Sequence, residues 1–134
     1  ETRGNQDCPV ILRGGKVPNY AAADVDAACA LLKAAGLREQ VMVDVSHANS
    51  SKQHQKQIEV AANVAQQIAA GDRRITGLMV ESHLEEGRQD IVPGQPLRVG
   101  VSVTDACISM AQTVPVLEGL AAAVRTRRAA AQVG

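Results

Sequence analysis

Apolar stretches alternate with amphipathic stretches along the chain, and this alternation predicts strands that are followed by helices. Three apolar runs are short, rich in branched residues and bounded by glycine or polar residues, as buried strands are. They span residues 9–15, 40–46 and 75–82. A fourth apolar run, at 97–103, indicates a possible short strand after a long polar connection.

Helical spacing of apolar residues follows the predicted strands. The second helix is predicted from about Ser51 to Ala70, and glycines at 36 and 71 are placed to end the first two helices. The expected core-facing positions are Val25, Ala28, Cys29 and Leu32 in the first helix, Ile58, Ala61, Ala62, Ala65, Ile68 and Ala69 in the second, and Val116, Leu117, Leu120 and Val124 in the last.

This order of elements predicts an α/β fold. Strands that alternate with helices of this length form parallel sheets with right-handed crossovers, and near-continuous apolar strands imply that both sheet faces are covered. A length of 134 residues suits one domain. We therefore expect parallel βα units, three in number, over residues 1–134.

A functional side chain ends each predicted strand. In parallel α/β folds the chemistry gathers at the carboxyl ends of the strands, and these ends carry Arg13, His47 and Glu81. Asp105, in the loop after the third strand, is placed to return to the same end. The four side chains are predicted to converge.

Strand alternation predicts which face of the sheet each side chain occupies, because residues two apart in a strand share a face. Arg13 then shares a face with Ile11, and His47 shares one with Val43 and Val45. By the same rule Asp44 points away from His47, which favours a structural or supporting role for this carboxylate.

His47, Glu81 and Asp105 form a candidate metal site. One imidazole and two carboxylates suit manganese, iron, cobalt or zinc. Their spacing forms no compact ligand motif. The alternative is that each is a solvated group at a loop end or a satisfied polar group of the core. His83 competes with Glu81 as the ligand from the third strand.

Arg13 is a candidate anion-binding residue. A guanidinium followed by the bare backbone amides of Gly14 and Gly15 can grip a phosphate or carboxylate, and Lys16 is a candidate to assist. The alternative is a turn whose arginine makes a surface ion pair.

Charge and cysteine content exclude several classes of protein. The 14 basic and 14 acidic side chains cancel, so nucleic acid and anionic membranes are not expected partners. A basic run, 125–128, suits a helix end. Three cysteines without a CxxC pair indicate free thiols, and no apolar run approaches the length of a membrane span. We expect a cytoplasmic protein whose sequence starts inside a larger one, because position 1 is Glu1.

Four blocks of the sequence resemble the metal-dependent (type I, class alpha) 3-deoxy-D-arabino-heptulosonate 7-phosphate (DAHP) synthases. They read DCPVILRGGKVPNY, VMVDVSHANSSKQ, GLMVESHLEEG and VTDACI. SHANSSKQ with a downstream MVESH argues against the related octulosonate synthases. The resemblance implies a (β/α)₈ TIM barrel, of which this chain would be the carboxyl-terminal part with strands 6 to 8.

The resemblance also implies an activity, which is condensation of phosphoenolpyruvate with erythrose 4-phosphate in the first step of the shikimate pathway. His47, Glu81 and Asp105 match ligands of the family's divalent metal. Arg13 matches a residue that binds the phosphate of phosphoenolpyruvate, and His47 lies near that group, so Arg13 and His47 are the expected catalytic residues. Asp105 is also expected at the substrate. The implied partners are the amino-terminal half of the barrel and further copies of the protein.

The sequence departs from the family in features that catalysis needs. A fourth metal ligand, a cysteine on the family's first strand, has no counterpart here, and neither has the Lys-Pro-Arg-Thr loop that holds erythrose 4-phosphate. One hypothesis is that the chain is active only with the rest of the barrel. The other is a non-catalytic fragment or assembly module, whose two open sheet edges and uncovered sheet face predict self-association or marginal stability.

Overall fold

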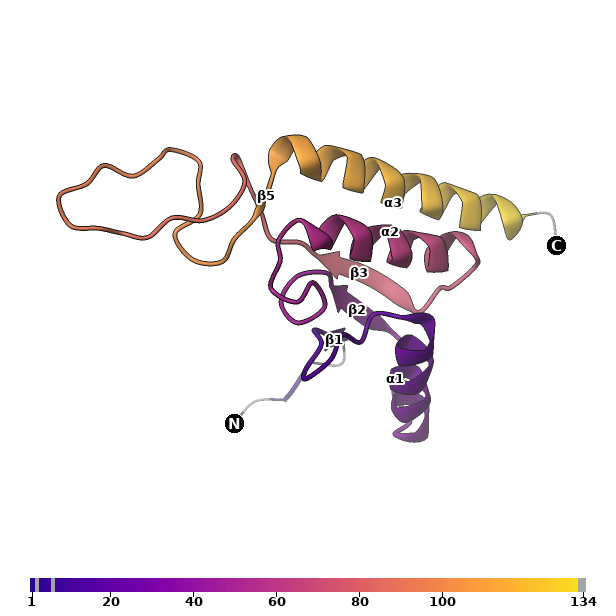
Figure 1. The fold of residues 1–134 in the computed structure, drawn as a ribbon. Coiled ribbons are helices and arrows are strands. Elements are labelled where there is room, and N and C mark those ends of the chain that lie inside the picture. The colour runs from indigo at the N-terminus through magenta and orange to yellow at the C-terminus, as the bar shows by residue number, and fades with distance from the viewer. Residues whose placement is uncertain (2, 6, 133–134) are drawn as a thin grey trace.

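The computed structural model describes residues 1, 3–5 and 7–132, and helices alternate with strands through this part of the chain (Figure 1). The elements are β1 (Val10–Leu12), α1 (Ala22–Ala34), β2 (Val41–Asp44), α2 (Lys56–Ala69), β3 (Ile75–Met79), β4 (Ser82–His83), β5 (Ile108–Ser109) and α3 (Met110–Ala130). Within these described ranges, no helix is both long and apolar enough to cross a membrane.

The main sheet contains β1, β2 and β3 in that order, and neighbouring strands are parallel. Val10 pairs with Val41, and Val43 pairs with both Leu12 and Leu78. The predicted α/β fold with parallel strands is therefore confirmed. Because the strands are parallel and adjacent in sequence order, their carboxyl ends meet along one edge of the sheet.

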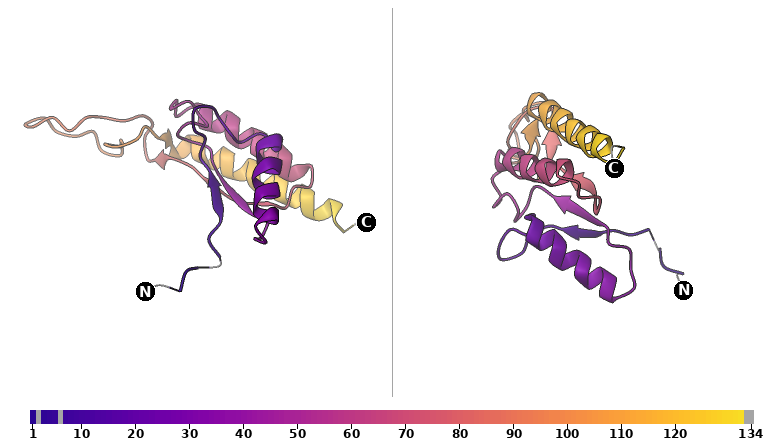
Figure 2. Two further views of the ribbon diagram at one scale, coloured as in Figure 1. Left: turned by 90° about the horizontal axis from the view of Figure 1, so that it is seen from below. Right: turned by 90° about the vertical axis from the view of Figure 1, so that its right-hand side faces the viewer.

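A second, smaller sheet joins β4 and β5, which are also parallel. The apolar run 97–103 is not a strand, and only Ser102 within it forms a bridge, to Arg88. The apolar pattern predicted a buried strand here, but Val99 is 90% exposed. Residues 84–106, which we call the arm, project away from the body of the protein in both Figure 1 and the left view of Figure 2.

One face of the main sheet forms the core with the three helices. Buried members are Leu12, Val41, Val43, Val45 and Ile75 from the strands and the residues after them, and Val25, Cys29, Val60, Ala61, Val64, Ile68, Val116 and Ala123 from the helices. In every view α3 runs along α2 (Figure 2). Burial of these branched side chains is the main stabilising contribution that the sequence offers.

Apart from the buried Asp44 at its carboxyl end, the opposite face of the sheet is largely uncovered in the described residues. Ile11, which pairs with Met42, is 44% exposed, and Met79 is 37% exposed. The expectation that both faces are covered is therefore wrong for this chain. Ile11 pairs with Met42 and so lies on the face opposite to Val43.

The helices differ from prediction in their starts and faces. The second helix begins at Lys56 rather than near Ser51, because residues 47–52 and 54–55 form turns. Its buried face is centred on Val60 and Val64, so Ile58 is 37% exposed, and in the last helix Leu117 is 54% exposed. The predicted ends of the first two helices are confirmed. Gly36 and Gly71 directly follow the C-caps of these helices, with φ of 69° and 113°.

Candidate metal centre

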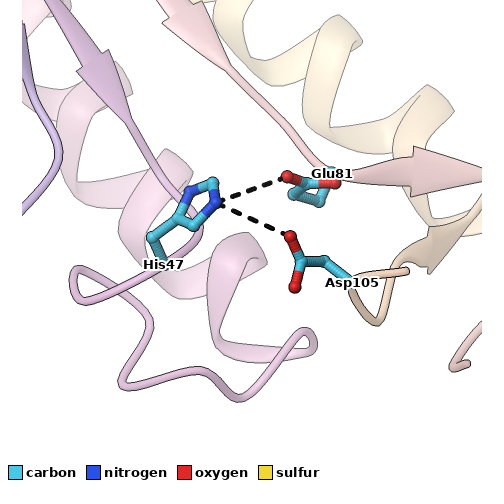
Figure 3. A group of neighbouring side chains, drawn as sticks. All are labelled: His47, Glu81 and Asp105. Carbon is cyan, nitrogen blue, oxygen red and sulfur yellow. Dashed lines mark ion pairs between the residues drawn. The ribbon is translucent and has the colours of Figure 1, made fainter.

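His47, Glu81 and Asp105 lie together at the carboxyl edge of the sheet (Figure 3). The Nε2 atom of His47 is 3.6 Å from Oε1 of Glu81 and 3.9 Å from Oδ2 of Asp105. One ligand atom from each residue lies within 4.8 Å of the other two. The structure thus brings together the three residues that the sequence singled out.

His47 reaches this position because the chain turns sharply after β2. The strand ends at Asp44, and His47 has a φ of 48°, in the left-handed region that is costly for a residue with a side chain. The amide of Lys52 donates to the carbonyl of His47 at 2.8 Å and helps to hold the turn. Strand alternation does not extend to His47, because β2 ends at Asp44, before this turn.

Asp44 supports the imidazole directly. Its Oδ2 atom is 2.7 Å from Nδ1 of His47, and its Oδ1 atom accepts a hydrogen bond from the Ser46 amide at 2.8 Å. The carboxylate is fully buried. The supporting role predicted for Asp44 agrees with this contact, whereas the prediction that it points away from His47 was wrong. With Nδ1 engaged, Nε2 is left to face the two carboxylates.

Glu81 is held in place by Gln57, which the sequence analysis missed. The side chain of Gln57 accepts from the Glu81 amide at 2.8 Å and donates to the Glu81 carbonyl at 3.1 Å. Gln57 is fully buried on α2. Its spacing from Val60 and Val64 puts a polar residue on the apolar face of a helix, and this signal could have identified it.

Asp105 enters from the end of the arm and is the most open member, with 70% of its side chain exposed. It lines a small pocket together with Ser46, His47, Lys52, His54 and Ala106. The competing ligand His83 lies outside the group, and its Nδ1 atom accepts a hydrogen bond from the Leu84 amide at 2.9 Å. Of the two candidates from this segment, the structure favours Glu81.

Arg13 lies beside the same buried carboxylate as His47. Its Nε atom is 3.7 Å from Oδ2 of Asp44, and 62% of its side chain is exposed. The neighbouring amides are not bare, since that of Gly14 donates to Asn19 Oδ1 at 2.6 Å and that of Gly15 donates to the Val17 carbonyl at 3.0 Å. The predicted anion grip by these amides is therefore wrong, and the guanidinium of Arg13 stays the candidate group of this segment.

The donor atoms fit a divalent transition metal. They comprise one imidazole nitrogen and two carboxylates, and the imidazole is oriented by a further carboxylate, as in many metal sites. Three protein ligands leave coordination positions for a substrate or another ligand. The fit rests on the chemistry and convergence of these side chains.

The chain is an α/β protein with a candidate metal centre. An imidazole and two carboxylates form this centre at the carboxyl edge of a parallel sheet. Residues 1–118 match the family model described as the DAHP synthetase I family. The chain belongs to this family.

Named relatives agree with the family match. The Phe-sensitive phospho-2-dehydro-3-deoxyheptonate aldolase of Escherichia coli strain K12 is 56% identical over 127 residues, which cover 95% of this chain and 36% of the relative. The tyrosine-inhibited enzyme of that name from Schizosaccharomyces pombe is 53% identical over 132 residues, with the same two shares. The chain thus spans about a third of the length of these relatives.

A solved structure extends the agreement to three dimensions. The phospho-2-dehydro-3-deoxyheptonate aldolase of Francisella tularensis SCHU S4 superposes with a TM-score of 0.89 and 48% sequence identity. The match covers 94% of this chain and 37% of that one.

Proposed function

We propose that this chain is the carboxyl-terminal part of a DAHP synthase. The reaction joins C3 of phosphoenolpyruvate to the aldehyde carbon of erythrose 4-phosphate, water adds at C2, and inorganic phosphate leaves. The observation that carries the proposal is the convergence of His47, Glu81 and Asp105 in a member of the DAHP synthetase I family. The names of the relatives support the same reaction and its place in aromatic amino acid biosynthesis.

In this proposal residues 1–134 form three βα units of a (β/α)₈ barrel, corresponding to strands 6 to 8. Two features support it, namely the consecutive order of the three parallel strands and the uncovered apolar face that carries Ile11, Met42 and Met79. That face would line the barrel interior, and the amino-terminal half would supply the missing strands.

His47, Glu81 and Asp105 would hold a divalent metal ion such as manganese, iron, cobalt or zinc. When bound, such an ion supplies Lewis acidity toward the aldehyde oxygen of erythrose 4-phosphate. Asp44 keeps Nε2 of His47 turned toward the two carboxylates. Asp105, the most exposed of the three, is also placed to meet the substrate.

Arg13 would bind the phosphate of phosphoenolpyruvate, with His47 nearby. Its guanidinium is mostly exposed, yet its Nε atom lies close to the buried carboxylate of Asp44. An arginine anchored at one nitrogen keeps other N–H groups free for bidentate contact with a phosphate. Its contribution to the rate would be positioning and neutralisation of phosphate charge.

A second candidate function is that of a non-catalytic assembly module, and the uncovered sheet face favours it. The two candidates differ in what they require of His47. Cytoplasmic location and homo-oligomerisation stay predictions under both.

Phosphate release from phosphoenolpyruvate tests the proposal. The purified chain is assayed with manganese, with and without erythrose 4-phosphate, alone and after addition of an amino-terminal part of the barrel. His47→Ala is compared with His83→Ala, which changes a nearby histidine outside the group.

Release that needs the sugar phosphate and His47, but not His83, supports the synthase. If it appears with the chain alone, the fragment rebuilds enough of the site by itself. Absence of release even with the amino-terminal part present would contradict the synthase and leave the assembly module.

A further inference from the structure

The side-chain amide of Asn49 joins the ends of β1 and β2, the strands that precede Arg13 and His47. Its Nδ2 atom donates to the Leu12 carbonyl at 3.0 Å and to the Asp44 carbonyl at 2.7 Å. Its Oδ1 atom accepts from the Asn19 amide at 2.7 Å. Only 3% of Asn49 is exposed. An amide that donates twice and accepts once cannot be replaced by a carboxylate, which does not donate when ionised.

Asn19 links Asn49 to Gly14, the residue after Arg13. Its side-chain Oδ1 atom accepts from the Gly14 amide at 2.6 Å. Asn49 therefore contacts the segment of Arg13 on both sides, directly at Leu12 and through Asn19 at Gly14.

Close packing of the two loops makes the connection rigid. Gly14 has a φ of 75°, and a Cβ atom placed there would lie 2.8 Å from Cβ of Ala48 and 3.0 Å from Oδ1 of Asn49. The loop after β1 thus rests directly on the turn that contains His47. A movement of one loop is transmitted to the other, because no space separates them.

We propose that Asn49 is a positioning residue that sets where Arg13 lies relative to His47. This inference rests on the proposed function, in which Arg13 holds the phosphate of phosphoenolpyruvate and His47 is a metal ligand. Errors of about 1 Å in such placement can cost two orders of magnitude in rate. Asn49 touches neither substrate in this account and acts only through the two residues it places.

A double-mutant cycle on phosphoenolpyruvate binding tests the proposal. Calorimetry measures the dissociation constant in the full-length protein that contains this chain, after removal of metal by a chelator. The variants are Asn49→Ala, Arg13→Ala and the double variant. Thr76→Val is the control, since it removes a hydrogen bond to the Val41 carbonyl at the opposite end of β2. Unfolding curves of every variant confirm that the measured protein is folded.

We expect Asn49→Ala to weaken binding about tenfold in the Arg13 background, because a misplaced guanidinium loses most of its bidentate contact. In the Arg13→Ala background the same change should have no further effect, since nothing remains to be positioned. Thr76→Val should stay within about twofold of the unchanged protein.

Equal losses from Asn49→Ala in both backgrounds would overturn the positioning role and leave a purely structural one. If Arg13→Ala itself leaves the affinity unchanged, the role of Arg13 in the proposed function fails, and the inference falls with it. Asn19→Ala is the second variant, which removes only the link to Gly14. It should weaken binding severalfold and, again, only when Arg13 is present.

Discussion

His47 and Asp44 are bound to each other across a turn, with Nδ1 of the imidazole 2.7 Å from Oδ2 of the carboxylate. Asp44 is fully buried, whereas 22% of the His47 side chain is exposed. The contact fixes the ring so that its other nitrogen faces Glu81 and Asp105. A buried carboxylate thereby orients the imidazole toward the other two members of the candidate metal centre.

Asp44→Asn should weaken metal binding without removing a ligand. The amide cannot accept from His47 with the strength of a carboxylate, and loss of such a supporting partner typically costs roughly 10- to 100-fold in metal affinity. Titration with Co²⁺, followed by visible absorption, measures the affinity. Asp90→Asn is the matched control, because Asp90 lies on the arm and is 78% exposed. Equal affinities of the two variants would show that Asp44 does not tune the site.

Glu81→Gln should weaken Co²⁺ binding by roughly tenfold or more, since it removes a charged ligand while keeping the shape of the side chain. Glu85→Gln provides the comparison, as it makes the same chemical change four residues further along, outside the group. Unchanged affinity in Glu81→Gln would remove this residue from the metal site.

Thiol reactivity should separate the three cysteines. Cys8 is exposed, while Cys29 and Cys107 are buried. Burial raises the pKa of the Cys29 and Cys107 thiols, so few thiolates form at pH 8. Ellman's reagent should modify Cys8 rapidly and the other two slowly, and Cys8→Ser should abolish the rapid phase. Three rapidly reacting thiols in the folded chain would contradict the buried positions.

Asp72 should stabilise the fold at neutral pH and lose this contribution in acid. Burial alone would raise its pKa, but hydrogen bonds from Arg74 outweigh burial and lower the pKa below its usual range. A lowered folded-state pKa means that the stabilisation is fully present above the unfolded-state value of about 3.9. It is lost as the pH falls through the folded-state pKa.

Urea unfolding at pH 7 and at lower pH measures this effect. Asp72→Asn should cost about 1 to 2 kcal/mol at pH 7, since a hydrogen-bonded charge is lost beside a partly exposed arginine. The difference from the unchanged chain should shrink as the pH falls below about 4. Asp90→Asn, which alters an exposed carboxylate on the arm, should show little difference at either pH. A difference for Asp72→Asn that is independent of pH would contradict the assigned ionic contact.

The uncovered face of the sheet should make the isolated chain associate. Ile11→Glu places a charge among exposed apolar residues of that face, and it should shift the chain toward monomer without lowering its melting temperature. Val99→Glu is the control, because Val99 is exposed on the arm instead. Sedimentation velocity measures the species present. A larger effect from Val99→Glu would place the contact on the arm.

Much of the fold and site could be predicted because apolar runs locate buried strands and their ends locate the chemistry. His47, Glu81 and Asp105 were found in this way, and the structure brings them together. The detail at His47 could not be predicted from parity. The strand ends at Asp44, His47 then adopts a left-handed conformation, and Ser51 and Lys52 do the same in the turns before α2. None of these three residues is a glycine that would mark such a turn.

Long-range pairing was the other feature beyond reach of local patterns. β4 and β5 have two residues each, and Ser82 pairs with Ile108, which follows the arm in the sequence. Such short strands have no periodicity to detect, whereas the apolar run at 97–103 has one without being a strand. The amide contacts of Asn49 and Gln57 depend on the fold being already in place.

Because β4 pairs with β5, the positions of the carboxylates in the candidate metal centre do not depend on the length of the arm. Ser82 pairs with Ile108, and the Ile108 amide donates to the Glu81 carbonyl at 3.0 Å. These contacts hold the segment of Asp105 beside Glu81, where the arm begins and ends. Doubling the length of a loop adds only about 0.6 kcal/mol to the cost of closing it. A longer arm would therefore cost little in closure entropy, and the pairing at its base would keep the two carboxylates at their spacing.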